Sequence, residues 1–144
     1  MVGLLVTGHA QFATGIGSGL NLITGIAEHI CLVDYGEEKN ADELYVCINE
    51  ALDKLKDCDG VLALTDLAGG LPFRTVAKCK AERLGQKIEI LAGANLPMLI
   101  EAGMMMYAFD CPFELGEIIL TAGKEHVVRY DCEVENDEAE LSEE

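Results

Sequence analysis

Four short apolar runs, each followed by a turn and an amphipathic helical pattern, constrain the fold of this chain more than any other feature. The runs cover residues 2–7, 30–35, 60–65 and 88–92. The third run shows no alternation of polar and apolar residues, as expected of a strand that is covered on both faces. Between the runs, apolar residues recur at spacings of three and four, as on one face of a helix. A regular succession of strands and helices predicts a mostly parallel sheet with helices on both faces.

This succession predicts a doubly wound, flavodoxin-like α/β sheet with the strand order 2-1-3-4. One more strand-like stretch, residues 127–134, follows the last expected helix at residues 114–124. Since an uncovered sheet edge invites pairing with another chain, we expect this stretch to complete a sheet in a homodimer, that of the partner subunit. We expect one domain at residues 1–130, followed by an acidic tail at 131–144 that holds eight acidic and no basic residues.

The chain is strongly acidic, with a formal net charge of −16. A surface of this sign disfavours nucleic acid, whose phosphates select basic partners, and favours basic proteins. No apolar run approaches the roughly 20 residues that a helix needs to span a bilayer. The N-terminus also lacks the basic segment of a signal peptide. We therefore expect a cytoplasmic protein that does not bind nucleic acid.

His9 lies in a turn between the first predicted strand and the helical pattern behind it. In the predicted order the carboxyl ends of strands 1 and 3 are neighbours, so Asp66, which follows strand 3, shares a crevice with His9. A carboxylate fixes one imidazole nitrogen as a donor and leaves the other free as a nucleophile or base. Gly69 and Gly70, just before the next helix, supply backbone N–H groups for a transferred oxyanion. The first turn of the helix behind His9 offers such groups as well.

Other chemistries lack a residue that they need. The two serines, Ser18 and Ser142, lie in a predicted helix and in the tail, and no G-x-S-x-G motif is present, which argues against a serine hydrolase. A phosphate-binding P-loop is missing as well. The six cysteines form no C-x-x-C pair, and His29 and His126 lie in separate segments, so we expect neither a metal site nor a cofactor. A histidine that carries a phosphoryl group covalently is the remaining interpretation.

Three motifs resemble the IIA component of mannose-family sugar phosphotransferase systems. They are Gly8-His9-x-x-x-Ala13-x-Gly15, Thr65-Asp66-x-x-Gly69-Gly70-x-Pro72-Phe73 and Gly93-x-Asn95-Leu96-Pro97-Met98, behind the first, third and fourth strands. The resemblance implies a cytoplasmic homodimer that accepts a phosphoryl group from phospho-HPr on His9, as a phosphotransferase with a phosphohistidine intermediate. The group then passes to a IIB component, which phosphorylates sugar brought in by the membrane components IIC and IID.

The resemblance also implies roles for single residues. His9 and Asp66 form the expected catalytic pair, in which Asp66 orients the imidazole ring. The expected phosphate-binding residues are Ala10, Thr65, Gly69, Gly70 and Leu71. Leu71 stands where the family often has serine or threonine, so the role of that hydroxyl passes to backbone N–H groups.

Two other functions are compatible with the same residues. The first is the phosphoryl-donor subunit of a phosphotransferase-dependent dihydroxyacetone kinase, a class that resembles this chain at the same histidine. The second is a non-catalytic, flavodoxin-like binding or regulatory module, which predicts no phosphohistidine. Incubation with phosphoenolpyruvate, enzyme I and HPr separates carriers from such a module, because only a carrier gains an acid-labile mass.

Overall fold

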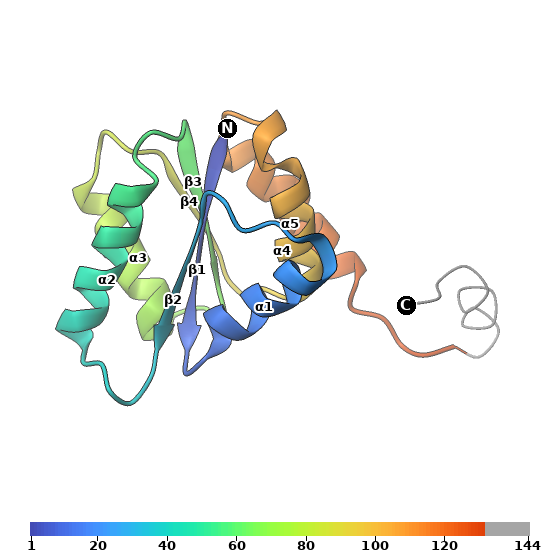
Figure 1. Ribbon diagram of the computed structural model, residues 1–144, viewed down its shortest axis with the longest axis horizontal. Coiled ribbons are helices and arrows are strands. Elements are labelled where there is room, and N and C mark those ends of the chain that lie inside the picture. The colour runs from blue at the N-terminus through green and yellow to red at the C-terminus, as the bar shows by residue number, and fades with distance from the viewer. Residues whose placement is uncertain (132–144) are drawn as a thin grey trace.

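A four-stranded parallel sheet with the strand order β2-β1-β3-β4 forms the centre of the molecule (Figure 1). The computed structural model describes residues 1–131. The strands are β1 (Val2–His9), β2 (Ile30–Tyr35), β3 (Gly60–Thr65) and β4 (Ile88–Leu91). The helices are α1 (Phe12–Thr24), α2 (Ala41–Lys54), α3 (Leu71–Glu82), α4 (Leu96–Met105) and α5 (Pro112–Glu125), with a short 3₁₀ helix at Met106–Ala108. The predicted fold class and strand order are confirmed.

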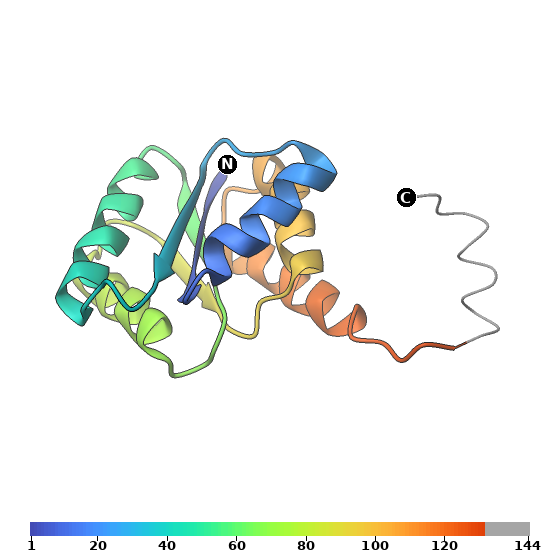
Figure 2. The same ribbon diagram turned by 60° about the horizontal axis from the view of Figure 1, so that its bottom comes forward.

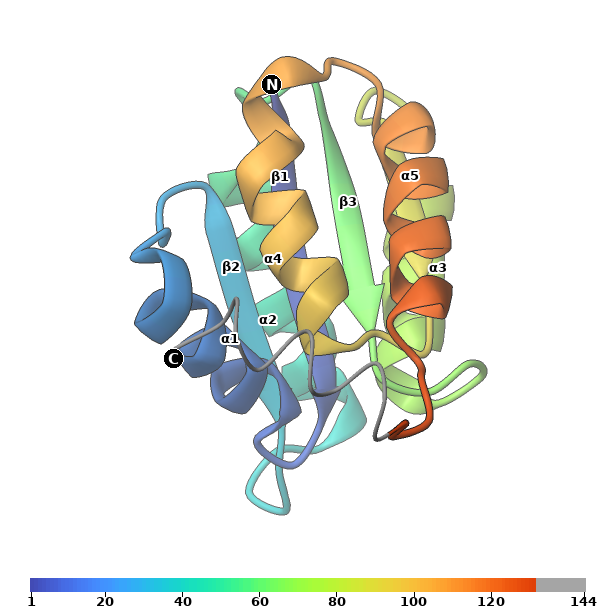
Figure 3. The same cartoon turned by 90° about the vertical axis from the view of Figure 1, so that its right-hand side faces the viewer.

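Helices cover both faces of the sheet, α2 and α3 on one side and α1, α4 and α5 on the other (Figures 1 and 3). Successive residues of β1 therefore enter two different cores, because side chains alternate across a strand. Leu4 and Val6 pack with residues of α1, α4 and α5, whereas Leu5 packs with residues of α2 and α3. Burial on both faces explains why these strands appear in the sequence as continuous apolar runs.

The parallel register brings the carboxyl ends of the strands to one edge of the sheet, seen at the front of Figure 2. His9 pairs with Tyr35 at the end of β2, and Thr7 pairs with Thr65 at the end of β3. The loops that follow β1 and β3 therefore start side by side. This edge is the topological switch point at which doubly wound sheets bind their ligands.

The helix ends follow local signals in the sequence. Asn95 caps α4 as predicted, since its side chain accepts a hydrogen bond of 3.0 Å from the backbone N–H of Met98. The apolar pattern of the first helix continues to Ala27, yet α1 ends at Thr24. Gly25 terminates α1 because it adopts the left-handed conformation, with φ of 74°.

The structure describes residues 127–131 of the predicted strand at 127–134, and it does not confirm a strand there. Residues 127–131 form no strand, and Val127, Val128 and Tyr130 are exposed. A lone segment gains no ladder hydrogen bonds without a neighbouring strand, and here the segment extends away from the domain after the end of α5 (Figure 1). The rest of that predicted strand and residues 132–144 of the acidic tail lie outside the described residues.

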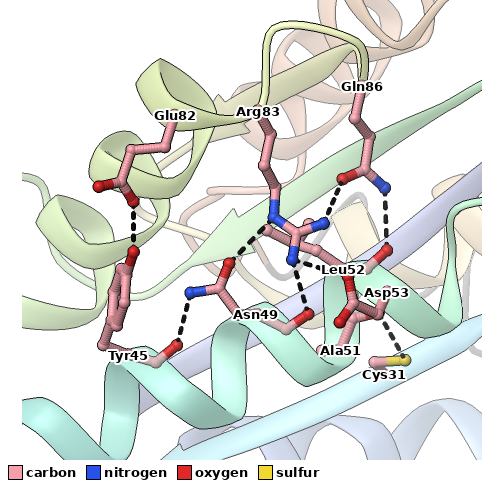
Figure 4. Close-up of polar contacts among 9 residues, drawn as sticks. All are labelled: Cys31, Tyr45, Asn49, Ala51, Leu52, Asp53, Glu82, Arg83 and Gln86. Atoms are coloured by element: carbon pink, nitrogen blue, oxygen red, sulfur yellow. Dashed lines mark hydrogen bonds and ion pairs between the residues drawn. The ribbon is translucent and has the colours of Figure 1, made fainter.

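Arg83 fastens the carboxyl end of α3 to α2 (Figure 4). Its Nε donates to Asn49 Oδ1 at 3.0 Å, and its Nη2 donates to the Asn49 carbonyl at 3.1 Å and to Asp53 Oδ1 at 2.8 Å. Its Nη1 donates to Gln86 Oε1 at 3.2 Å, and Gln86 Nε2 donates to the Leu52 carbonyl. Two of these bonds reach carbonyl groups in the second half of α2, and together they join the end of α3 to α2.

Candidate active site

The imidazole of His9 projects from the last residue of β1 toward the loop that follows β3. Its Nδ1 lies 2.9 Å from Oδ2 of Asp66, and the backbone N–H of His9 donates to the same oxygen at 2.8 Å. The His9 side chain is 43% exposed and that of Asp66 is 18% exposed. One nitrogen of the ring is therefore engaged with a mostly buried carboxylate, while the ring itself is open to solvent.

The electrostatics of the pair favour an ionised Asp66. Burial raises the pKa of the Asp66 carboxyl, but the backbone and side-chain hydrogen bonds from His9, together with its charge, outweigh burial and hold that pKa below its usual value. Gly8 permits this close approach, because a Cβ at that position would lie 2.8 Å from Asp66 Cγ. An ionised Asp66 that accepts from Nδ1–H leaves Nε2 with its lone pair.

The other edge of the imidazole faces the amino end of α3. A Cβ at Gly70 would lie 2.8 Å from Cε1 of His9 and 3.5 Å from Nε2, so any side chain at this position would displace the imidazole. Gly70 is also the N-cap residue of α3, and it has no side chain with which to cap the helix. The first amide of α3 to bond back along the chain is that of Arg74, which donates to the Gly70 carbonyl. The N–H groups of Leu71 and Phe73 precede it and have no acceptor within the helix.

The amino end of α1, in contrast, is already occupied by a carboxylate of the protein itself. Asp34 at the end of β2 accepts from the backbone N–H of Thr14 at 3.0 Å and from its hydroxyl at 2.6 Å. The anion site that the sequence predicts in this first turn therefore already holds a carboxylate on its Thr14 N–H. The amino end of α3 is the helix terminus that remains next to His9.

The predicted phosphate-binding residues divide into two groups. Gly69, Gly70 and Leu71 form the loop and the first residue of α3 beside the imidazole. Thr65 is fully buried and its hydroxyl donates to the Leu91 carbonyl at 2.9 Å, so the structure does not bring that hydroxyl to the site. The N–H of Ala10 donates to the Tyr35 carbonyl at 2.8 Å, which leaves it no donor for a ligand.

The structure places two further residues at this edge that the sequence analysis did not identify. The ring of Tyr35 meets that of His9 edge-on, with 6.2 Å between the centroids. Arg74 lies in the first turn of α3 and donates from Nε to the Gly69 carbonyl at 3.0 Å. The position of Tyr35 at the end of β2 was a usable signal, because the register places it opposite His9. Arg74 gave no such signal, since its contact depends on the conformation of the loop.

Neither a candidate metal site nor a membrane-spanning helix is found among the described residues. Within residues 1–131, no three His, Cys, Asp or Glu side chains are grouped so that they could hold a metal ion. None of the helices in the same range has the length and apolar character needed to cross a membrane.

The fold and this edge of the sheet define a class: flavodoxin-like α/β proteins with a histidine–carboxylate pair at the switch point. A family model, EIIA-man, described as the PTS system fructose IIA component, matches residues 3–112. The chain therefore belongs to the EIIA-man family of phosphotransferase-system IIA components.

Individual relatives agree with this assignment. The chain is 29% identical over 127 residues to the PTS system mannose-specific EIIAB component of Escherichia coli (strain K12), which covers 88% of this chain and 38% of that protein. It is 28% identical over 101 residues to the PTS system fructose-specific EIIA component of Bacillus subtilis (strain 168), covering 70% of this chain and 68% of the relative. The crystal structure of the phosphotransferase system component EIIA from Streptococcus agalactiae superposes with a TM-score of 0.83 at 29% identity, covering 90% and 97% of the two chains.

Proposed function

We propose that this protein is a phosphoryl carrier that accepts a phosphoryl group from phospho-HPr on Nε2 of His9 and passes it to a IIB component. One observation carries the proposal: Nδ1 of His9 is held by Asp66, while the Nε2 edge of the ring faces the uncapped amino end of α3. Membership of the EIIA-man family supports the same chemistry.

The transfer step needs no group beyond the two histidines and their surroundings. The lone pair of His9 Nε2 attacks the phosphorus of the donor phosphohistidine, a new N–P bond forms, and the donor N–P bond breaks. Its electron pair returns to the donor imidazole. The His9 ring keeps its proton on Nδ1 and becomes cationic, and the ionised Asp66 at 2.9 Å stabilises that charge. Transfer to the IIB component runs through the same steps in reverse.

The amino end of α3 serves the transferred oxygens. Phosphoryl transfer relies on positioning and on electrostatic stabilisation of charge spread over three oxygens. The amides at the start of α3 and its helix dipole supply both next to Nε2. Gly69 and Leu71 contribute backbone N–H groups rather than side chains to this role, whereas the N–H of Gly70 already donates to the Leu67 carbonyl at 3.1 Å.

A direct test incubates the protein with phosphoenolpyruvate, enzyme I and HPr and follows an acid-labile mass increase of one phosphoryl group. We expect labelling of the wild type, of His29→Gln and of His126→Gln, and none of His9→Gln. Labelling of His9→Gln, or a wild type that stays unlabelled while HPr is phosphorylated, would overturn the proposal. The second result would favour a non-catalytic binding module.

The working assembly is part of the same proposal. We infer a cytoplasmic homodimer in which residues 1–130 form the carrier domain, the segment from residue 127 pairs with the partner's sheet, and residues 131–144 form an acidic tail. The exposed Val127, Val128 and Tyr130 support this inference, because apolar side chains gain stability from a covered surface. Deletion of residues 127–144 should give monomers or insoluble protein in sedimentation; a soluble dimer after the deletion would contradict it. The IIC and IID components act downstream of IIB and need no direct contact with this chain.

A further inference from the structure

Arg74 is bonded to the loop that presses against His9. Its Nε donates to the carbonyl of Gly69 at 3.0 Å. Gly69 adopts the left-handed conformation, with φ of 79°, and precedes Gly70, where an added Cβ would lie 2.8 Å from Cε1 of His9. The hydrogen bond therefore fixes the carbonyl at the point where the loop turns toward Nε2 of His9.

The position of Arg74 is unfavourable for the helix that carries it. It is the fourth residue of α3, whose first turn holds no acidic residue. A cation near a helix amino end opposes the helix dipole and destabilises the helix. Arg74 is also exposed, and its two Nη groups have no hydrogen-bond partner among residues 1–131. Helix stability therefore does not account for an arginine here.

The same groups suit a dianionic phosphoryl group on His9. Leu71 contributes no hydroxyl, and the amino end of α1 is occupied by Asp34. The charge of the phosphoryl group must then be balanced mainly at the amino end of α3, where Arg74 adds a full positive charge to the partial charge of the dipole.

We propose that Arg74 is a positioning residue for phosphoryl transfer, which holds the Gly69–Gly70 turn against His9 and keeps a cation beside the phosphoryl site. This inference rests on the proposed function of His9. Arg74 acts through the loop, since its one hydrogen bond is to the Gly69 carbonyl.

Three variants test the inference in the full-length chain. Arg74→Met removes the donor and the charge but keeps an unbranched side chain. Arg74→Lys keeps the charge. Lys78→Met is the matched control, because Lys78 lies one turn further along α3, with its Nζ 4.5 Å from the centroid of the Tyr45 ring. We expect Arg74→Met to lower the maximal rate of transfer from phospho-HPr about tenfold, with a KM within about twofold of wild type. Arg74→Lys should recover most of that rate, and Lys78→Met should match the wild type.

A second measurement tests the loop contact without any phosphorylation. In NMR spectra of the unmodified protein, Arg74→Met should shift the amide signal of Gly70 and the Cε1–H signal of His9, whereas Lys78→Met should shift neither. Wild-type maximal rates for Arg74→Met, or an equal rise of KM in both methionine variants, would overturn the inference and assign Arg74 to partner docking. If His9 itself is never labelled, the proposed function fails, and unshifted signals of Gly70 and His9 in Arg74→Met would independently refute the loop contact.

Discussion

The two ends of α3 each carry an arginine, but in the described part of the chain the arginine at the carboxyl end is hydrogen-bonded through every guanidinium nitrogen and the one at the amino end is not. At the carboxyl end, Arg83 uses Nε and both Nη groups in hydrogen bonds to α2 and Gln86 (Figure 4). At the amino end, Arg74 makes one side-chain hydrogen bond within residues 1–131, and Gly70 leaves the helix without a side-chain cap. The first arrangement satisfies the polar groups of the protein, and the second leaves them open to a ligand.

This contrast separates stability from function within one helix. Polar groups that are fully hydrogen-bonded hold neighbouring elements together, because breaking one hydrogen bond leaves its partner group unsatisfied. Polar groups without partners contribute little to folding and are available to bind charge in a preorganised geometry. Substitutions at the amino end should therefore change transfer, and matched substitutions at the carboxyl end should change stability.

The largest effect on transfer is expected for Gly70→Ala. The added Cβ would lie 2.8 Å from Cε1 of His9, so the imidazole must move. A displacement of about 1 Å in a reacting group lowers the rate by about a hundredfold. Gly85→Ala at the other end of α3 is the control, because a Cβ there meets nothing within 4 Å. Single-turnover transfer from phospho-HPr measures both variants; equal rates would show that Gly70 does not constrain His9.

A smaller loss is expected for Asp66→Asn. The variant keeps the shape of the side chain but removes the charge that stabilises a cationic His9 ring. A charge-assisted hydrogen bond is worth roughly 1.5–3 kcal/mol, so transfer should slow by about tenfold to a hundredfold. NMR of the phosphorylated wild type should place the group on Nε2. Phosphate on Nδ1, or wild-type rates for Asp66→Asn, would show that the carboxylate has another role.

Arg83→Met should leave transfer within about twofold of wild type and lower the free energy of unfolding by about 1–3 kcal/mol. The loss arises because Asn49 Oδ1, the Asn49 carbonyl and Gln86 Oε1 each lose a part-buried hydrogen bond from Arg83. Urea unfolding followed by circular dichroism measures it. Asp53→Asn is the milder companion, since the Asp53 side chain is 66% exposed and an exposed ion pair contributes about 0–1 kcal/mol. Slow phosphoryl transfer by a folded Arg83→Met variant would contradict the assignment of transfer to the amino end of α3 and of stability to its carboxyl end.

The smallest effect is the pH dependence of stability that Asp66 contributes. Its pKa is lower in the folded chain than in the unfolded chain, so its ionised form stabilises the fold above the unfolded value of about 3.9. That contribution is lost as the pH falls through the lowered folded pKa. The difference in unfolding free energy between wild type and Asp66→Asn should therefore shrink in acid. A difference that stays constant from about pH 6 to pH 3 would contradict the lowered pKa.

Much of the fold follows from the sequence alone. Burial on both faces makes each strand a continuous apolar run, and a helix between successive strands favours a parallel arrangement. The flavodoxin-like order expected of such a succession made the adjacency of His9 and Asp66 predictable. The cap of α4 was predictable too, because Asn95 acts on its own helix. The segment after residue 126 was not, since a strand depends on a neighbour that a single chain does not supply.

The details of the site depend on contacts between distant elements. The Asp34 carboxylate reaches α1 only because β2 and β1 align Gly8 with Asp34, and a shift of one residue would point that side chain to the other face. The Thr65 hydroxyl faces β4 rather than the site for the same reason. Periodicity predicts which strands are neighbours, but register decides which side chains meet.

The Asp34 carboxylate at the amino end of α1 affects how tightly the protein would hold a phosphoryl group on His9. A phosphoryl carrier must not hold its phosphoryl group too tightly. Its phosphorylated form has to lie close in free energy to the phosphorylated donor and to the phosphorylated acceptor. Two uncapped helix amino ends directed at one phosphoryl dianion would lower the free energy of the phosphorylated protein and lengthen its lifetime. If His9 carries a phosphoryl group as proposed, Asp34 neutralises one of these helix ends, and we expect weaker binding of the phosphoryl group and a higher group-transfer potential. Asp34→Asn should accordingly slow the onward transfer more than the loading step.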